Sequence, residues 1–518
     1  MALSIERKQQ WLLFLAVCLL AILLRWPSLE QPLDNDGGAR AYHARLILAG
    51  EPLYSSHHTG HHLPGIYYTY ALALALFGDS GWSVKFLLIL WTIPTLYCLY
   101  RLGIVLVNNA AGLLAALFYA VLSAHVWLWG QTAETELFAN LPRIAAVLVV
   151  LHLTQQQAPA WKFAFVGLLA AAAFLFKALY LSPLIMAGVV LLGEAWHKRQ
   201  AAGVWSEMAR RGLWVGTGFL SGLLPTILYF SWLGLLPRLL LVFTLGQDYA
   251  AASDVIPEAI PLFGPWILHP LLPLLGLAIN NAILLSFSLA GFLFVLIIGK
   301  YRSSPLIYLA AWYIFALFEA GINLELFAHY YLLVVPPLSL LAAWFLLKLV
   351  GDIAERRTRA NRWVAPGLLL ALLALSLSVS IVQNYYYYYH YWQYKIGKET
   401  QADFVRNGWP DFGERIARAS VLAAYVRERT DPADRIYYWS EDVQLYYLAN
   451  RRSPLDTLWP IDVEATGSYH RIFVPQTKYV IVDRYREPAA PGWLYTSLSQ
   501  RYTLEMVVDG QEIYRRLE

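Results

Sequence analysis

The sequence has little charge for its length. Only 14% of its 518 residues are Asp, Glu, Lys or Arg, whereas a soluble chain carries about a quarter. Hydrophobic residues make up 58% of the chain and gather in long runs, which is typical of a protein that crosses a membrane several times. The formal net charge of +4 is small, so we expect no nucleic-acid partner.

Cysteine is also scarce. The two cysteines, Cys18 and Cys98, both lie inside apolar runs, and this excludes a disulfide framework or a cysteine-based zinc cluster. The first apolar run lacks a small-residue cleavage site, so we expect a retained helix rather than a removed signal peptide. No repeat with a period of about 20–50 residues is evident, which argues against a solenoid.

The apolar runs predict about eleven membrane-spanning helices, since a spanning helix needs about 20 mostly apolar residues. The expected spans are approximately 11–26, 84–101, 109–129, 137–153, 161–177, 180–196, 213–232, 272–298, 305–321, 330–349 and 363–384. The run 65–77 is short for a span. It fits an interfacial or re-entrant helix better.

Basic residues predict how the chain is oriented. If the run 65–77 does not cross, IERK before the first span and most of the basic loops, among them HKRQ and ERRTRANR, share one side. The positive-inside rule makes that side the cytoplasm. The N-terminus is then inside and the C-terminus outside. The long outside segments are 27–83, roughly 233–271 and the tail after about 385.

The tail becomes polar and charged from residue 395. Helices are expected over 413–430 and 441–450, and strands over 435–440, 477–484 and 502–510. This alternation predicts a small α/β domain outside the membrane. The predicted domains are therefore a transmembrane domain over 1–394, with its first outside loop over 27–83, and an extracytoplasmic domain over 395–518. The tyrosine run NYYYYYHYWQY fits an interfacial aromatic belt, with a sugar-stacking platform as the alternative.

The first outside loop contains a dense group of ionisable residues, DNDGGARAYHARLILAGEPLYSSHHTGHHLPGIYY. GARAYHARLILAG predicts a short helix, with Asp36 as its N-cap, Gly50 as its C-terminal stop and Arg40 one turn from Asp36. A surface helix followed by solvated histidines is the simplest interpretation. The clustering favours a site for a lipid phosphate, because arginine binds phosphate bidentately and carboxylates serve as general bases. The paired histidines, which include His61 and His62, would hold a metal or bind an anion.

Other segments on the predicted outer side repeat the pattern. Glu134 and Glu136 precede a span, Lys177 lies near an outer boundary, and His329 and Tyr330 lie at another. Ionisable residues near or inside spans indicate function, although snorkelling to the interface is the alternative for Lys177. Because all of these residues share the side of the first outside loop, the sequence predicts one active site in an outward-facing cavity.

Several motifs resemble those of the GT-C glycosyltransferases, in particular the bacterial branch related to protein O-mannosyltransferases and aminoarabinose–lipid A transferases. DGGARAYHARLILAGEPLY resembles the acidic loop after the family's first span, and HHLPGIYYTYALALALFG resembles its proline-headed interfacial helix. TAETELFANLP resembles the segment in which an acidic residue opens a later span of the family. AHYYLLVVPPLSLL resembles the family's later helix that contains HY and PP. The tail around RIYYWSEDVQLYYLANRR is similar to that of bacterial members. The likeness covers nearly the whole chain.

The resemblance implies an inverting transferase of the bacterial cytoplasmic (inner) membrane. Its donor is a polyprenyl-phosphate hexose or pentose, and its acceptor is a glycolipid, a polysaccharide or a protein. Asp36 corresponds to the catalytic base, with Asp34 as the alternative. The residues assigned to the donor phosphate are Arg40, His62, Lys177, His329 and Tyr330. Those assigned to the substrate pocket are Tyr42, Glu134 and Glu136, and a divalent metal ion, the one cofactor expected, is assigned to His61 and His62.

Two other functions stay open at this point. A transporter or flippase of lipid-linked sugars would use the intramembrane charges as a substrate or proton path. No inverted repeat is evident, however, and the charges gather on one side. A non-catalytic scaffold for envelope assembly would use the tail as its interaction module. Consumption of a lipid-linked sugar with release of polyprenyl phosphate distinguishes the transferase from both.

Overall fold

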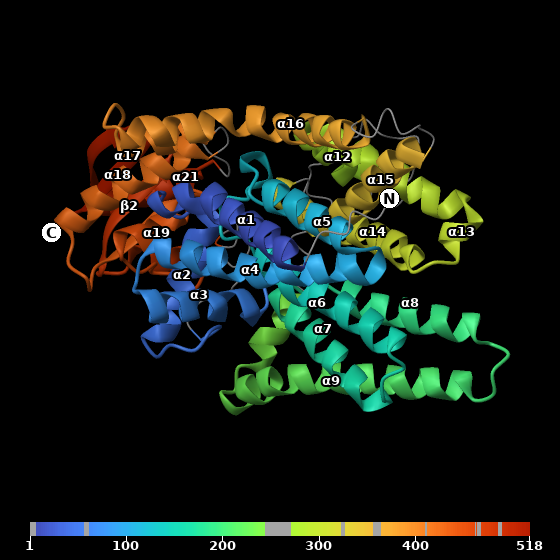
Figure 1. Ribbon diagram of the computed structural model, residues 1–518. Coiled ribbons are helices and arrows are strands. Elements are labelled where there is room, and N and C mark those ends of the chain that lie inside the picture. Colours follow the sequence, from blue (N-terminus) through green and yellow to red (C-terminus); the bar gives the residue numbers. More distant parts are fainter. Residues whose placement is uncertain are drawn as a thin grey trace, which may run out of the picture.

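A computed structural model places a bundle of long helices beside a smaller domain with a four-stranded sheet (Figure 1). The structure describes residues 7–55, 62–243, 271–322, 327–355, 364–409, 412–460, 463, 468–484 and 489–517. The fold class expected from the sequence, a polytopic α-helical membrane protein with a small C-terminal α/β domain, is confirmed.

Each predicted span corresponds to a helix in the described part of the chain. These helices are α1 (Arg7–Arg25), α4 (Gly81–Leu106), α5 (Asn109–Leu122), α6 (Thr135–Gln155), α7 (Ala164–Phe176), α8 (Ser182–His197), α9 (Val204–Trp232), α12 (Leu272–Ile297), α14 (Leu306–Gly321), α15 (Val335–Glu355) and α16 (Val364–Lys395). Seven of them are long and apolar enough to cross a membrane, and α5, α7 and α14 are shorter apolar helices. The chain is a multi-pass membrane protein. The count of eleven membrane crossings stays a prediction.

The short apolar run forms helix α3 (Pro64–Phe77). It begins with a proline in its first turn, where no backbone donor is needed, and it ends at Gly78, whose φ of 97° stops the helix. Its 14 residues extend over about 21 Å, which is less than the ~30 Å hydrocarbon core of a bilayer. The length therefore agrees with an interfacial or re-entrant helix.

Two glycines allow a close approach between α7 and α9. A Cβ on Gly167 of α7 would overlap the backbone of α9 at Val215, and a Cβ on Gly218 of α9 would overlap the backbone at Ala164. Small residues at such positions let two backbones pack directly, which stabilises helix pairs where water supplies no hydrophobic driving force. Helices α7 and α9 pack together along their length in this way.

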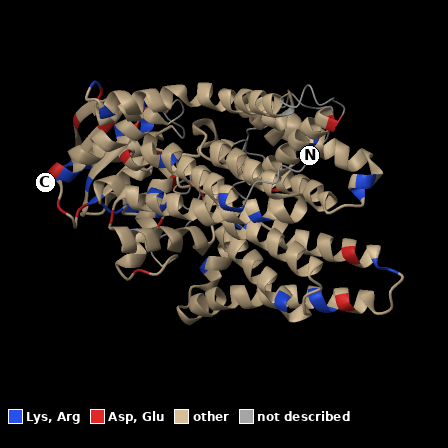
Figure 2. Cartoon of the chain, viewed as in Figure 1, with Lys and Arg blue, Asp and Glu red and all other residues tan. Residues whose placement is uncertain are grey.

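Charged side chains are concentrated at the two ends of the bundle (Figure 2). One end carries the connection between α8 and α9, where Glu194 pairs with Lys198 and Arg211, and the short helix α13 (Gly299–Arg302). The sheet domain lies at the opposite end (Figure 1). The basic residues of these two connections therefore lie away from the sheet domain, and the orientation of the chain in the membrane stays a prediction.

The C-terminal domain contains the elements expected from its sequence and several more. Strands β1 (Arg435–Trp439) and β2 (Thr477–Asp483) are parallel, while β4 (Gln511–Arg516) pairs antiparallel with β2 and with β3 (Tyr502–Val508), in the order β1-β2-β4-β3. The expected helices are α18 (Gly413–Arg429) and α19 (Gln444–Ala449). The sequence analysis did not predict β4, α17 (Gln401–Gly408), α21 (Gly492–Arg501) or the 3₁₀ turn η7 (Ser468–Phe473).

The tyrosine run belongs to the last part of α16. Tyr385 and Tyr386 are exposed, which fits an aromatic belt at a membrane interface. Tyr387 instead turns into the protein, where its hydroxyl donates to the side chains of Gln31 and Gln131. The run therefore contributes to the core as well as to the surface.

Helix α2 (Asn35–Leu48) connects the bundle to the sheet domain. Its N-cap is Asp34, whose carboxylate accepts from the backbone N–H of Gly37 at 3.5 Å, so the prediction of Asp36 as the cap was wrong. Gly50, with a φ of 88°, follows the end of the helix as expected. At Gly38 a Cβ would overlap Gln444, because α19 packs directly on this face of α2.

Candidate active site

The loop that leads into α2 is held by a buried lysine. The Nζ of Lys85, from α4, donates to the backbone carbonyls of Ser28, Gln31 and Pro32 at 2.9–3.1 Å. A buried ammonium is costly unless its donors are satisfied, and three carbonyls satisfy it here. The lysine thereby fixes the backbone just before Asp34, where the helix begins.

Arg40 joins two carboxylates at the centre of the site. One Nη atom donates to Asp36 at 2.9 Å and the other to Glu134 at 2.8 Å. Arg40 and Glu134 are 3% and 0% exposed, whereas Asp36 is 31% exposed. Burial alone lowers the pKa of Arg40, but Glu134 and Asp36 outweigh it and raise the pKa above its ordinary value. Arg40 therefore stays charged. It fixes the carboxylate of Asp36, which is the one side chain of these three that reaches solvent.

Asp34 is chemically different from Asp36. Burial, followed by the neighbouring Glu134 and Asp36 carboxylates, raises the pKa of Asp34 to about 7. The residue is 5% exposed and one of its carboxylate oxygens caps α2. Its other oxygen, Oδ1, has no hydrogen-bond partner among the described residues. A carboxyl group with this pKa suits proton transfer near neutral pH, but its burial restricts access to substrate.

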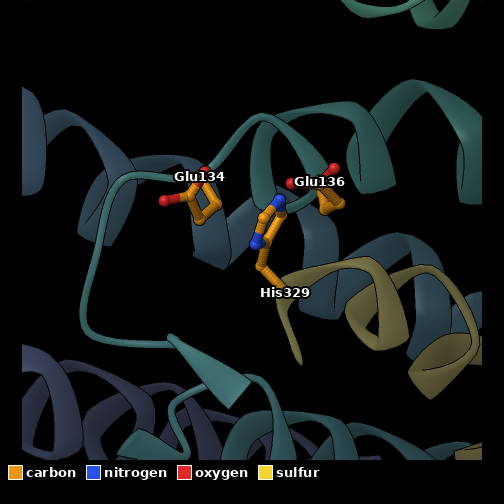
Figure 3. A group of neighbouring side chains, drawn as sticks. All are labelled: Glu134, Glu136 and His329. Atoms are coloured by element: carbon orange, nitrogen blue, oxygen red, sulfur yellow. The ribbon is translucent and has the colours of Figure 1, made fainter. Parts of the chain in front are cut away.

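A second cluster lies next to Arg40. Glu134 and Glu136 come from the start of α6, and His329 comes from the 3₁₀ turn η5 (Ala328–Leu333) ahead of α15 (Figure 3). One potential ligand atom from each residue lies within 4.8 Å of the others, and all three side chains are buried. Carboxylate oxygen and imidazole nitrogen are the donor types that divalent cations bind in proteins.

The polar atoms of this cluster fit a cation. Glu134 Oε1, Glu136 Oε2 and His329 Nδ1 are buried and have no hydrogen-bond partner among the described residues. An unsatisfied buried acceptor costs about 1–3 kcal/mol, and more when it is charged. A divalent cation held by these three residues, named here the Glu–Glu–His cluster, would satisfy all three atoms at once.

His329 is surrounded by aromatic rings. Trp129 stacks on it with a centroid distance of 4.6 Å, and Tyr330 lies edge-on at 4.3 Å. Burial lowers the pKa of His329 to about 4, although Glu136 and Asp36 act in the opposite direction. The imidazole is therefore neutral near pH 7, which is the form that ligates metals, and it carries no positive charge for a phosphate.

Lys177 and Tyr330, both assigned to the donor phosphate, lie next to each other. The Nζ of Lys177 is 4.2 Å from the centroid of the Tyr330 ring, a cation–π contact. Lys177 is 4% exposed, so its side chain does not snorkel to a membrane surface. Its charge acts on the His329 imidazole, which places the ammonium at the edge of the Glu–Glu–His cluster.

Three predicted site residues lie elsewhere or are not described. The hydroxyl of Tyr42 accepts from the backbone N–H of Ser453 at 3.3 Å, so this side chain faces the sheet domain rather than Asp36. His62 lies near the start of α3, with Tyr67 beside its ring and its carbonyl accepting from Tyr54. His61 lies outside the described residues. In the described part of the chain the metal-compatible group is the Glu–Glu–His cluster, and the assignment of a metal to His61 and His62 stays a prediction.

The structure adds residues that the sequence analysis did not assign. The hydroxyl of Tyr180 donates to Glu136 at 2.5 Å and orients it. Arg143 forms a buried ion pair with Glu319, and Glu319 also accepts from the backbone of Ser182. Tyr180 follows Lys177 by three residues and Glu319 is an acidic residue in an apolar helix, so intramembrane polarity was the available signal for both.

Comparison with known proteins agrees with this architecture. Residues 61–210 match the family model described as dolichyl-phosphate-mannose-protein mannosyltransferase. ArnT from Cupriavidus metallidurans, solved with undecaprenyl phosphate, superimposes with a TM-score of 0.58 at 13% identity, over 99% of each chain. The chain has the fold of the GT-C glycosyltransferases.

The oligosaccharyltransferase AglB from Archaeoglobus fulgidus shows the same fold. Its complex with an inhibitory peptide and a dolichol-phosphate gives a TM-score of 0.55 at 11% identity, over 98% of this chain and 74% of that one. A complex of the Archaeoglobus fulgidus oligosaccharyltransferase with Zn and sulfate gives 0.51 at 13% identity, over 97% and 73%. No curated protein matches the sequence significantly.

Proposed function

We propose that the protein is an inverting glycosyltransferase that takes a sugar from a polyprenyl-phosphate donor. The observation that carries this proposal is the partly exposed Asp36 carboxylate, fixed by Arg40 beside a buried cluster that fits a cation. The fold agrees, because the similar ArnT structure holds undecaprenyl phosphate and the AglB structure a dolichol-phosphate.

In the proposed reaction Asp36 acts as the general base. It accepts the proton of an acceptor hydroxyl or amine while that group forms a bond to the anomeric carbon of the sugar. The bond between this carbon and the phosphate oxygen breaks, and the electron pair leaves with polyprenyl phosphate. Phosphate is a good leaving group, so a single carboxylate suffices, in contrast to the carboxylate pair of glycoside hydrolases.

Positive charge stabilises the leaving phosphate in this proposal. Lys177 is the first candidate because its ammonium lies beside the Glu–Glu–His cluster. Arg40 acts as a positioning residue, since two of its donors are committed to carboxylates. The reaction takes place at the outer face of the bacterial inner membrane, with the sheet domain on the extracytoplasmic side.

A divalent cation in the Glu–Glu–His cluster fits this function. Such an ion would neutralise charge on the phosphate oxygens. The similar oligosaccharyltransferase from Archaeoglobus fulgidus has been solved with Zn and sulfate. We expect the purified protein, after treatment with a chelator and dialysis, to rebind about one equivalent of Mn²⁺ or Zn²⁺ by elemental analysis. Glu136→Gln should reduce this binding at least tenfold, and equal binding by the variant would exclude the cluster.

The function is tested with purified protein and a panel of radiolabelled polyprenyl-phosphate sugars, supplied with envelope extract as the acceptor source. Wild type should consume one donor, and Asp36→Asn should reduce the rate at least 100-fold. Asp79→Asn is the matched control, because Asp79 is another aspartate of this loop but pairs with Arg45 at the surface. No donor consumption by wild type would contradict the transferase proposal.

Asp34→Asn separates the two candidate bases. Asparagine is as good an N-cap as aspartate, so this substitution preserves the start of α2 while removing the charge. Retained activity is expected. If Asp34→Asn abolishes turnover and Asp36→Asn does not, Asp34 is the base.

A further inference from the structure

Three aromatic rings from distant parts of the chain meet beside the Glu–Glu–His cluster. Trp129 lies in the connection between α5 and α6, Phe327 directly precedes η5, and Phe412 directly precedes α18 in the tail. The centroid of the Trp129 ring lies 4.5 Å from that of Phe412 and 5.9 Å from that of Phe327. We name these three rings the aromatic patch.

The aromatic patch lies at the surface of the protein rather than in its core. Phe327 is 40% exposed, and Trp129 and Phe412 are half-buried. Their ring neighbours His329 and Tyr330 are each only 5% exposed. The packing of these side chains therefore leaves ring surface of the aromatic patch open to a ligand, with the largest exposed fraction at Phe327.

The backbone holds Trp129 in a conformation that a tryptophan rarely adopts. Its φ of 55° and ψ of 29° lie in the left-handed region, which is unfavourable for a residue with a bulky side chain. The N–H of Trp129 donates to the carbonyl of Val126 at 2.9 Å, and the carbonyl of Trp129 accepts from the backbone N–H of Thr132 at 3.0 Å. Backbone strain persists where the surrounding structure fixes it, and it concentrates at functional sites.

The aromatic patch adjoins the reacting groups of the proposed transferase. The Trp129 ring stacks on His329 at 4.6 Å, and the Phe327 ring is nearly parallel to the same imidazole at 5.8 Å. The charges of Asp36 and Lys177 both act on this imidazole. In the donor, the sugar is bonded directly to the phosphate, and its anomeric carbon has to reach Asp36. The sugar therefore has to lie near the aromatic patch.

The chemistry of the aromatic patch suits a sugar better than a phosphate. The three rings have no formal charge, and the face of an aromatic ring carries partial negative charge. Such a face disfavours phosphate oxygens and favours C–H groups, which a sugar ring presents on one face while its hydroxyls lie around the edge. Ligand sites in proteins commonly combine aromatic walls with a few polar groups. Here the polar groups are those of the neighbouring site, Asp36 and Lys177.

We propose that the aromatic patch binds the C–H face of the donor sugar and so places its anomeric carbon next to Asp36. This inference rests on the proposed transferase function and adds a sugar subsite to it. Phe327 contributes most to the affinity for the sugar, because its ring is the most exposed of the three. The polyprenyl chain and the phosphate bind elsewhere, so their contribution to the affinity does not depend on Phe327.

The test compares lipids that differ only in the sugar. The purified full chain is titrated in detergent, without acceptor, with a panel of radiolabelled undecaprenyl-phosphate sugars and with undecaprenyl phosphate itself. One donor should bind more tightly than undecaprenyl phosphate. Phe327→Ala should weaken the binding of this donor about 10-fold, the effect of losing about 55 Å² of covered apolar surface. The same variant should leave the binding of undecaprenyl phosphate unchanged.

Two further variants show whether the aromatic ring itself is needed. Phe327→Tyr keeps a ring and should keep the affinity for the donor. Phe318→Ala is the matched control, because Phe318 is 47% exposed on α14 and lies outside the aromatic patch, and it should change neither affinity. Binding of Mn²⁺ should be the same in Phe327→Ala and wild type, because Phe327 supplies no ligand to the Glu–Glu–His cluster.

Unchanged donor affinity in Phe327→Ala would overturn the proposal. Equal weakening of undecaprenyl phosphate would assign the aromatic patch to the lipid chain instead, and loss of Mn²⁺ binding together with donor binding would show that Phe327 only supports His329. A panel in which no donor binds more tightly than undecaprenyl phosphate would mean that the aromatic patch binds no sugar. Failure of the transferase function alone shows differently, as a donor that binds more tightly than undecaprenyl phosphate but is not consumed when acceptor is supplied.

Discussion

Removal of the Arg40 guanidinium provides the sharpest test of the site. In Arg40→Gln, the Glu134 carboxylate stays buried at 0% exposure and loses the only hydrogen-bond partner that its side chain has in the described part of the chain. Breaking a buried ion pair by removing one partner costs about 3–5 kcal/mol. Asp36 also loses the contact that orients it, so we expect donor consumption to fall by at least 100-fold.

Arg45→Gln is the matched control on the same helix. Arg45 pairs with Asp79, but the two side chains are 24% and 47% exposed, and an ion pair at the surface contributes about 0–1 kcal/mol. The midpoint of thermal inactivation in detergent should therefore fall clearly for Arg40→Gln and little for Arg45→Gln. Both variants are measured at the same protein and detergent concentration.

The double variant Arg40→Gln/Glu134→Gln distinguishes two causes of lost stability, an unpaired buried charge and the loss of side-chain packing. It removes both charges, so most of the lost thermal stability should return while donor consumption stays low, because Asp36 is still not oriented. Equal stability of Arg40→Gln and Arg45→Gln would refute the buried-bridge reasoning. So would a double variant that is less stable than Arg40→Gln.

Two further substitutions test how the bundle and the tail support the site. Gly38→Val should push a side chain against Gln444 of α19, so we expect faster proteolysis of the tail and loss of donor consumption. Gly351→Val is the control, because Gly351 has open space around it, and it should change neither the proteolysis nor the donor consumption. Glu319→Gln should leave the buried Arg143 without its counter-charge and lower the stability by about 3–5 kcal/mol. Recovery of stability in Glu319→Gln/Arg143→Met would confirm that the unpaired buried charge causes the loss. No loss of stability in Glu319→Gln would contradict it.

The helices of the bundle were predictable because length and apolarity alone define a membrane-spanning segment. The start of α2 was not predictable, because Asp34 and Asp36 are both good N-caps and only the position of the donating N–H, at Gly37, decides between them. Strand β4 is polar and was missed. The dipeptide Asp509-Gly510, with φ values of 47° and 77°, was nevertheless a strong hairpin signal before it.

For the site itself, the sequence predicted only that its residues share one side of the membrane. The sequence analysis placed Glu134, Glu136 and His329 on one side of the membrane, and the structure brings these side chains to within reach of one ion. Their mutual distances depend on how α6 meets the turn before α15, and no sequence spacing encodes that contact. The pair of Arg143 and Glu319, separated by 176 positions, could not be predicted for the same reason.

The support of α2 indicates why the sheet domain belongs to this enzyme architecture. Lys85 holds the loop before the helix, Arg40 ties its first turns to α6, and the Asn35 side chain, at its start, accepts from the backbone N–H of Val443 in the tail. A helix of 14 residues is marginal in isolation, so these contacts determine where Asp36 lies. The tail is therefore part of the support of the catalytic helix, and movement of the tail would move the proposed base.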